Sequence, residues 1–298
     1  MSDVLTTHNL SKRYRKQLAL DKLSLAVPEG SVYALLGPNG AGKTTALKLV
    51  MNLHPPTFGE AKVLGIDSRR LQGRHFEQIG YVSENQELPG WMTMSYLFRY
   101  LKPFYPTWDD ERVSELVTQF RLPMDRPLKH FSRGMQMKAA LASSLAYHPK
   151  LLVLDEPFSG LDPLTREELI GALLECGQQL SVVVSSHDLA DIESFASHIG
   201  YLEQGRLEFG EELAVLTARF REMEVTLNEP ALPAPWPAHW LRPEASPAVV
   251  RFVETHFDAD RTIGEIRLLF RGVTHIEANP MPLRSIFVTL ARASQIAA

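Results

Sequence analysis

The stretch Gly37-Pro38-Asn39-Gly40-Ala41-Gly42-Lys43-Thr44 decides the fold predicted for this chain. It satisfies the pattern G-x-x-x-x-G-K-[ST] between a strand-like run at 31–36 and a helix-like run at 44–53, the context in which this motif binds phosphate. The glycines let backbone N–H groups converge on phosphate oxygens, Lys43 neutralises charge, and the Thr44 hydroxyl can ligate Mg²⁺. The predicted nucleotide-binding loop comprises Gly37, Pro38, Asn39, Gly40, Ala41, Gly42, Lys43, Thr44 and Thr45.

A second motif places two acidic residues, Asp155 and Glu156, directly after the apolar run 151–154. Another apolar strand at 181–185 follows a helix-like stretch at 164–179, and this βαβ alternation predicts a parallel sheet. A buried strand beside the phosphate loop would direct its polar end toward the nucleotide. We expect Asp155 to bind Mg²⁺, through water, and Glu156 to orient the attacking water.

Composition narrows the class of protein. A length of 298 residues favours one large and one small domain. The net charge of -4 removes the simplest electrostatic argument for a nucleic-acid partner, so none is expected. The single cysteine, Cys176, excludes an intrachain disulfide and fits a reducing, cytosolic environment. The N-terminus lacks the apolar core of a secretory signal, and no apolar run approaches the roughly 20 residues of a spanning helix.

The middle of the chain predicts helices. An aromatic segment at 91–108 precedes a helix for which Thr107 is the expected cap, with acidic residues at 109–111 suiting the positive end of the helix dipole. Its apolar face contains Val113, Leu116, Val117 and Phe120. A further helix is expected to start at Ser132 and to run through alanine-rich sequence.

The pattern breaks around Glu222, where closely spaced prolines indicate a linker or a loop-rich small domain. Beyond them, 249–253 reads as a strand and 282–293 as a helix. We predict domains at 1–221 and 222–298. The second contains no evident catalytic constellation, and dimer support, regulation and simple packing all remain open for it. The prolines are Pro230, Pro233, Pro235, Pro237, Pro243 and Pro247.

The sequence Phe131-Ser132-Arg133-Gly134-Met135-Gln136, at a helix start before the acidic strand, resembles the signature of ATP-binding cassette proteins. The resemblance covers roughly residues 4–216. It implies an α/β fold: a P-loop NTPase core with a mainly parallel sheet, an inserted helical subdomain at about 85–148, and here a small C-terminal α+β extension. It also implies that one subunit's signature faces the γ-phosphate held by another subunit. The signature residues acting in trans are Ser132, Arg133, Gly134 and Met135.

Other matches occur in family order. His187, just after the strand at 181–185, resembles the switch histidine that contacts the γ-phosphate, so the resemblance assigns catalysis to Glu156 and His187. Tyr14 matches the aromatic residue on which adenine stacks, although an ordinary surface tyrosine is the alternative. The loop for communication across a dimer matches Ser159, Gly160, Leu161 and Asp162.

The chain departs from the family pattern at two places. Glu84 takes the position where most members have a glutamine that senses Mg²⁺ and the partner interface, and Gln86 is an alternative for that role. A carboxylate can ligate Mg²⁺, so the implied metal residues are Thr44, Asp155 and Glu84. Within the signature, Arg133 and Met135 replace the commoner glycine and glutamine, and Arg133 could attract phosphate or simply be solvated.

The resemblance implies an ATPase that uses ATP and Mg²⁺ in a homodimer or heterodimer and drives a separate integral membrane permease, with export as the expected direction. Its place would be the cytoplasmic face of the cell membrane. The aromatic segment 91–108 would receive the permease or form a subdomain core. The alternatives are a soluble mechano-ATPase acting on ribosomes or DNA, for which the usual second cassette or long insertion is missing, and a regulatory ATP-binding module, which the catalytic residues disfavour.

Overall fold

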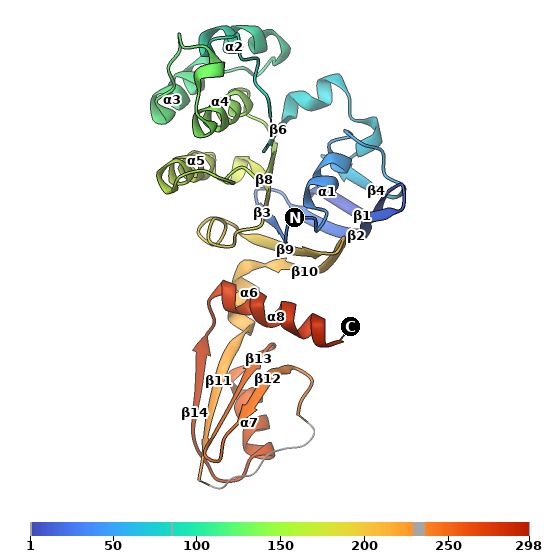
Figure 1. Cartoon of the computed structure of the whole chain (residues 1–298), viewed down its shortest axis with the longest axis vertical. Helices are drawn as coiled ribbons and strands as arrows, with labels where there is room; N and C mark the ends of the chain where they lie inside the picture. The colour runs from blue at the N-terminus through green and yellow to red at the C-terminus, as the bar shows by residue number, and fades with distance from the viewer. Residues whose placement is uncertain (1, 85, 229–235, 298) are drawn as a thin grey trace. The chain divides into compact units, whose positions relative to one another are not determined.

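The computed structural model describes residues 2–84, 86–228 and 236–297. The chain divides into two compact units, Met1–Gly210 and Glu211–Ala298. Figure 1 colours the chain from blue at the N-terminus to red at the C-terminus. The sequence placed this boundary after residue 221 instead. Glu211 and Arg219 form an ion pair of 2.6 Å, and Arg219 Nη1 donates to the Thr255 carbonyl at 2.6 Å, so the residues between the two boundaries pack with the second unit.

The first unit is built on two sheets. One has the order β2-β1-β4-β5 and is antiparallel, and the other has the order β10-β9-β3-β8-β7-β6, in which β9, β3, β8, β7 and β6 are parallel. This α/β arrangement confirms the mainly parallel core predicted from the sequence. The strands are β1 Asp3–Tyr14, β2 Gln17–Pro28, β3 Val32–Leu36, β4 Phe58–Val63, β5 Ile66–Asp67, β6 Ile79–Ser83, β7 Leu151–Asp155, β8 Ser181–Ser186, β9 His198–Glu203 and β10 Arg206–Glu212.

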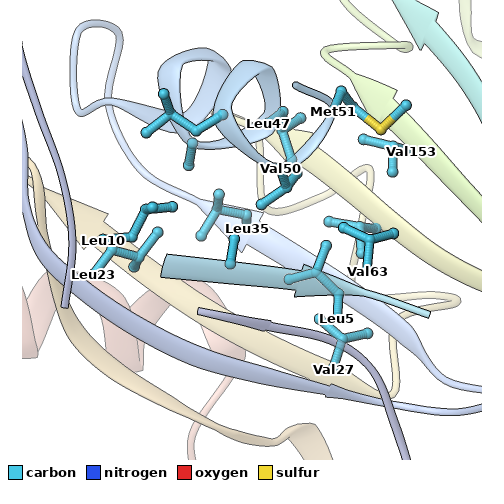
Figure 2. Packing of buried hydrophobic residues seen from close by; sticks show 14 of the residues in the cluster. Leu5, Leu10, Leu23, Val27, Leu35, Leu47, Val50, Met51, Val63 and Val153 are labelled. Atoms are coloured by element: carbon cyan, nitrogen blue, oxygen red, sulfur yellow. The ribbon is translucent and has the colours of Figure 1, made fainter. Parts of the chain in front are cut away.

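The core of the first unit lies between the two sheets and helix α1, Lys43–Val50. Figure 2 shows Leu47 and Val50 of this helix in one cluster with Leu35 of β3 and Leu10 and Leu23 of the antiparallel sheet. Truncating such a fully buried leucine to alanine costs about 2–5 kcal/mol. Because the strand and helix on both sides of the phosphate loop contribute to this cluster, hydrophobic packing fixes the ends of the loop.

The helices between β6 and β7 form a separate group in Figure 1. Asp109, not Thr107, caps α3: its carboxylate accepts from the backbone N–H of Glu111 and of Arg112, whereas the Thr107 hydroxyl donates to the Tyr147 carbonyl. The prediction of Thr107 as the cap is therefore wrong, because a tertiary acceptor engages its hydroxyl. The helices of the first unit after α1 are α2 Met94–Leu101, α3 Asp110–Phe120, α4 Arg133–Leu145 and α5 Pro163–Glu175, with 3₁₀ turns η1 Ser68–Arg70, η2 Gly73–Gln78, η3 Lys102–Phe104, η4 Leu128–His130 and η5 Gly177–Gln179.

The second unit is a four-stranded antiparallel sheet of order β12-β13-β11-β14 with helices, the α+β extension that was predicted. Its core contains Trp240 stacked on Phe252 at 3.8 Å between ring centroids. The described prolines of the predicted linker, Pro237, Pro243 and Pro247, fall within this unit; Pro230, Pro233 and Pro235 lie outside the described residues. Its elements are α6 Leu213–Arg219, β11 Arg221–Leu227, β12 Trp240–Ala245, β13 Val249–Glu254, α7 Ala259–Leu269, β14 Val273–Pro280 and α8 Leu283–Ala297.

Among the residues described, no helix combines the length and apolar character needed to cross a membrane.

Candidate active site

The phosphate loop connects β3 to α1, as predicted. Gly42 caps the helix at φ 109°, where a Cβ atom would lie 2.5 Å from the Ala19 carbonyl oxygen, so only glycine fits. The loop delivers Lys43 to the first position of α1 with its side chain buried. Lys43 Nζ donates to the carbonyl oxygens of Gly37 at 2.7 Å and Pro38 at 3.3 Å. The ammonium is thereby held at the mouth of the loop.

Asp155 lies at the carboxyl end of β7, within reach of Thr44 on α1. Its Oδ1 accepts from the Thr44 hydroxyl at 2.9 Å and from the Ser185 hydroxyl at 2.7 Å. Burial raises the pKa of Asp155, and these two hydroxyl donors partly oppose that shift. A hydroxyl and a carboxylate that converge in this way are the oxygen ligands that Mg²⁺ prefers. The two predicted metal residues therefore fit the ion that the phosphate loop implies.

Glu156 connects three parts of the predicted site. Its Oε1 lies 3.0 Å from Lys43 Nζ, and its Oε2 lies 2.7 Å from His187 Nδ1. The carboxylate is buried, whereas the His187 ring is partly exposed just beyond β8. Glu156 adopts φ 50°, an uncommon conformation for a residue with a side chain and one that concentrates at functional sites. The structure thus brings three residues of the predicted site into contact, because Glu156, predicted to orient the attacking water, touches both Lys43 and His187.

Ser185 is a functional residue that the sequence reading missed. Its hydroxyl donates to Asp155 and accepts from the backbone N–H of Glu156 at 2.9 Å, so one side chain positions both acidic residues. The strand register explains the contact, because Asp155 pairs with Ser185 between β7 and β8. A fully buried serine at the end of the run Val182, Val183 and Val184 was the available signal.

The signature segment begins α4, with Ser132 as its cap. The Ser132 hydroxyl accepts from the Met135 N–H at 3.3 Å, which confirms the predicted helix start. A Cβ on Gly134 would lie 3.2 Å from Thr165 Cγ2, so glycine permits close approach of α4 to α5. Within the described residues, no hydrogen bond or ion pair joins this segment to the phosphate loop of the same chain.

The two residues that depart from the family pattern contact each other. Arg133 Nη2 lies 3.0 Å from Glu84 Oε1, with both side chains partly exposed. Arg133 also lies against the backbone of Gly160, since a Cβ there would be 3.5 Å from its guanidinium. Gln86, the alternative to Glu84, bonds back to the Ser83 N–H at 3.3 Å. Arg133 is therefore exposed, as a solvated side chain would be, and is also paired with Glu84; its attraction for phosphate and the assignment of Glu84 to the metal stay predictions.

The remaining predicted residues are those of the dimer-communication loop and Tyr14. Asp162 caps α5 by accepting from the Thr165 N–H and hydroxyl, and the hydroxyl bond is the main cause that lowers the pKa of Asp162. Leu161 of the same loop is buried, and the Ser159 N–H donates to the Glu156 carbonyl at 3.3 Å. Tyr14 is 39% exposed at the end of β1, with Lys12 Nζ 5.0 Å from the centroid of its ring and His54 in edge-on contact with it. Its role with adenine stays a prediction.

Comparisons with known proteins agree with this geometry. A family model described as ABC transporter matches residues 20–159. The probable multidrug ABC transporter ATP-binding protein YbhF of Escherichia coli is 34% identical over 212 residues, which are 68% of this chain and 36% of that protein. The bacitracin transport ATP-binding protein BcrA of Enterococcus faecalis is 32% identical over 213 residues, which are 70% of this chain and 68% of that protein. The chain thus spans about a third of the first relative and two thirds of the second.

The fold of this chain is also similar to that of a solved ATP-binding cassette. The dimeric post-hydrolysis state of an ATP-binding cassette bound to ADP and Pi covers 70% of this chain and 98% of its own, with a TM-score of 0.62 and 27% identity. One family accounts for the shared fold and for the relatives in sequence. It also accounts for the contacts of Lys43, Asp155 and Glu156. The chain belongs to the ATP-binding proteins of ABC transporters, and its first unit is the ATPase cassette of that family.

Proposed function

We propose that this chain binds and hydrolyses MgATP at the interface of two cassettes and so drives a separate membrane permease, in the direction of export. The observation that carries the proposal is the contact of Glu156 with both Lys43 and His187. The names of the relatives, which concern multidrug and bacitracin transport, support transport as the output.

ATP binding is proposed to change the partners of Lys43. Its ammonium, with three N–H donors, contacts two loop carbonyls and the Glu156 carboxylate. Phosphate oxygens arriving at the loop would replace the carboxylate as its anionic partner. This exchange would free Glu156 at the moment the nucleotide binds, so the base would be held inactive until then.

Hydrolysis then requires a positioned water and a compensated phosphate charge. Mg²⁺ bound by Thr44 and Asp155 would neutralise charge on the phosphate oxygens. Glu156 would accept the hydrogen bond of the attacking water, and His187, held at 2.7 Å from that carboxylate, would orient the carboxylate and contact the γ-phosphate. Ser185 keeps Asp155 and Glu156 in register with each other.

Dimerisation follows from the separation of the half-sites. Ser132 and Arg133 are exposed at the N-terminus of the 13-residue helix α4, where the helix dipole favours an anion. They have no hydrogen bond or ion pair with their own phosphate loop among the described residues, so a second cassette would supply the phosphate that they contact. The relative solved as a dimer with ADP and Pi supports this arrangement. Homodimer and heterodimer both fit.

The helical group provides a surface suited to a permease. Trp91 is 69% exposed and packs edge-on against Tyr96, and Phe104, 59% exposed, contacts Tyr100. Exposed aromatic side chains are enriched in protein interfaces and are costly to leave in water. We therefore assign docking of the permease to these four side chains, hereafter the aromatic surface, rather than to a packed subdomain core.

Phosphate release by the purified chain, compared with the Glu156→Gln variant, tests the proposed hydrolysis. Copurification with a membrane protein tests the proposed output. Hydrolysis that is equal in both proteins would overturn the catalytic assignment. Recovery of only ribosomal or DNA partners would overturn the transport assignment.

A further inference from the structure

Three side chains of the second unit converge at one point. His239 precedes β12, Glu254 ends β13, and Glu265 lies on α7. His239 Nε2 is 3.0 Å from Glu265 Oε2 and 3.6 Å from Glu254 Oε2, and the three ligand atoms all lie within 4.8 Å of one another. Antiparallel pairing of Trp240 with Glu254 brings the turn containing His239 beside the end of β13.

Among the residues that the structure describes, no lysine or arginine side chain balances the charge of this cluster. Glu254 is fully buried; its carboxylate accepts from Trp240 Nε1 at 3.0 Å and from the His256 N–H at 2.7 Å, and both donors are neutral. No Lys or Arg within the described part of the chain forms an ion pair with Glu254 or Glu265. A buried carboxylate without a compensating charge is costly. A divalent cation would supply the missing charge.

The spacing fits a single ion. Zinc binds imidazole nitrogen and carboxylate oxygen at about 2.0–2.2 Å, which places tetrahedral ligand atoms roughly 3.4 Å apart. The two distances from His239 Nε2, 3.0 and 3.6 Å, lie on both sides of that value. The side chains of His239 and Glu265 are each 30% exposed, so the ion has a route from solvent and a free position for water. An imidazole ligand favours Zn²⁺ over Mg²⁺ or Ca²⁺.

We propose that His239, Glu254 and Glu265 form a structural site for a divalent transition metal ion, with Zn²⁺ as the matching ion. The ion would join the turn before β12, the end of β13 and helix α7. Because all three ligands belong to the second unit, the proposal is independent of the nucleotide chemistry of the first.

The test uses the full chain, stripped with a chelator, freed of nucleotide and titrated with Zn²⁺ alone. His239→Gln and Glu265→Gln each remove one partly exposed ligand, so they spare the buried Glu254, whose replacement endangers folding. The matched control is His275→Gln, which breaks an exposed two-residue contact of 3.2 Å with Glu277 in the same unit. Equilibrium dialysis with elemental analysis measures affinity and stoichiometry, and thermal unfolding measures stabilisation.

We expect the wild type and His275→Gln each to bind one Zn²⁺ ion per chain. Binding should raise the unfolding temperature of both proteins. His239→Gln and Glu265→Gln should lower the affinity by at least about tenfold, because loss of even an outer partner of a metal ligand costs that much. Absence of binding to the wild type would overturn the site and leave His239 as a hydrogen-bond donor to the carboxylates. Equal binding by all four proteins would also overturn it, since the ion would then occupy other histidines. Phosphate release from ATP depends on neither outcome.

Discussion

Arg133 Nη2 lies 3.0 Å from Glu84 Oε1. Among the described residues, this is the only ion pair that the signature segment makes. Each residue alone adds a charge where the family pattern is neutral. Together they cancel, which gives a physical reason for both departures. The pair also links the end of β6 to the start of α4 within one chain.

The pair predicts coupled effects on hydrolysis. Arg133→Gly should leave Glu84 uncompensated beside the nucleotide and reduce kcat/KM for MgATP roughly fivefold, the effect of about 1 kcal/mol. Glu84→Gln combined with Arg133→Gly should restore part of the rate, since it removes the uncompensated charge of Glu84 but not the loss of the proposed Arg133 contact with phosphate. Steady-state phosphate release from the four proteins of the double-mutant cycle provides the measurement. Additive losses in the double variant would show that the two side chains act independently.

Replacing Lys43 should weaken nucleotide binding itself. Lys43→Ala removes a charge-assisted contact to phosphate, worth about 1.5–3 kcal/mol, so the Kd for ATP should rise at least tenfold. Titration calorimetry measures the affinity, with the exposed Lys62→Ala on β4 as control. Because the variant also leaves the buried Glu156 without its ammonium partner, circular dichroism must first confirm the fold. Tight ATP binding by a folded Lys43→Ala protein would place the phosphate site elsewhere.

We expect the buried carboxylate of Asp155 to lower the stability of the fold at neutral pH, although the proposed metal site needs it. Burial raises the pKa of its carboxyl, so the folded state holds the proton more tightly than the unfolded chain. Such a group penalises folding once the pH exceeds its folded pKa, and the penalty disappears below the unfolded pKa near 3.9. Without nucleotide or metal, Asp155→Asn should therefore raise the unfolding temperature at pH 7 and change it little near pH 4. A variant less stable than the wild type at pH 7 would argue that the hydrogen bonds of Asp155 outweigh its burial.

The aromatic surface should matter only when the permease is present. Trp91→Ala and Phe104→Ala should each reduce copurification of the membrane protein while phosphate release by the isolated chain stays within about twofold, since surface changes of this kind cost little stability. Leu174→Ala, which truncates an exposed side chain on α5, is the matched control. If both aromatic variants copurified normally, the docking surface would have to lie elsewhere.

The sequence predicted the parts of the site that depend on local chemistry. The phosphate loop, the Ser132 cap and the acidic end of β7 each follow from a short run of residues whose backbone requirements are local. Contacts set by tertiary packing were not predictable in that way. Thr107 lost its expected capping role to a carbonyl forty residues away at Tyr147.

Other features of the fold and the site depend on the register of the sheet or on contacts between distant segments, so they could not be predicted from short runs of sequence. Ser185 contacts Asp155 because β7 and β8 pair in parallel register, which a single strand does not encode. The boundary between the units falls before α6 rather than after it, because Arg219 bonds to Thr255, the residue that directly follows β13. The contact between Glu84 and Arg133 likewise joins segments that the sequence reading treated separately.

We infer that Glu156 triggers hydrolysis at a site completed by a second cassette. Size-exclusion chromatography of Glu156→Gln with and without ATP measures this dimer, with Lys43→Ala as the control that should not respond. We expect an ATP-dependent dimer of Glu156→Gln that releases little phosphate, because the amide keeps the geometry but cannot accept the proton of the attacking water. A Glu156→Gln protein that stays monomeric with ATP bound would rule out a site shared by two cassettes.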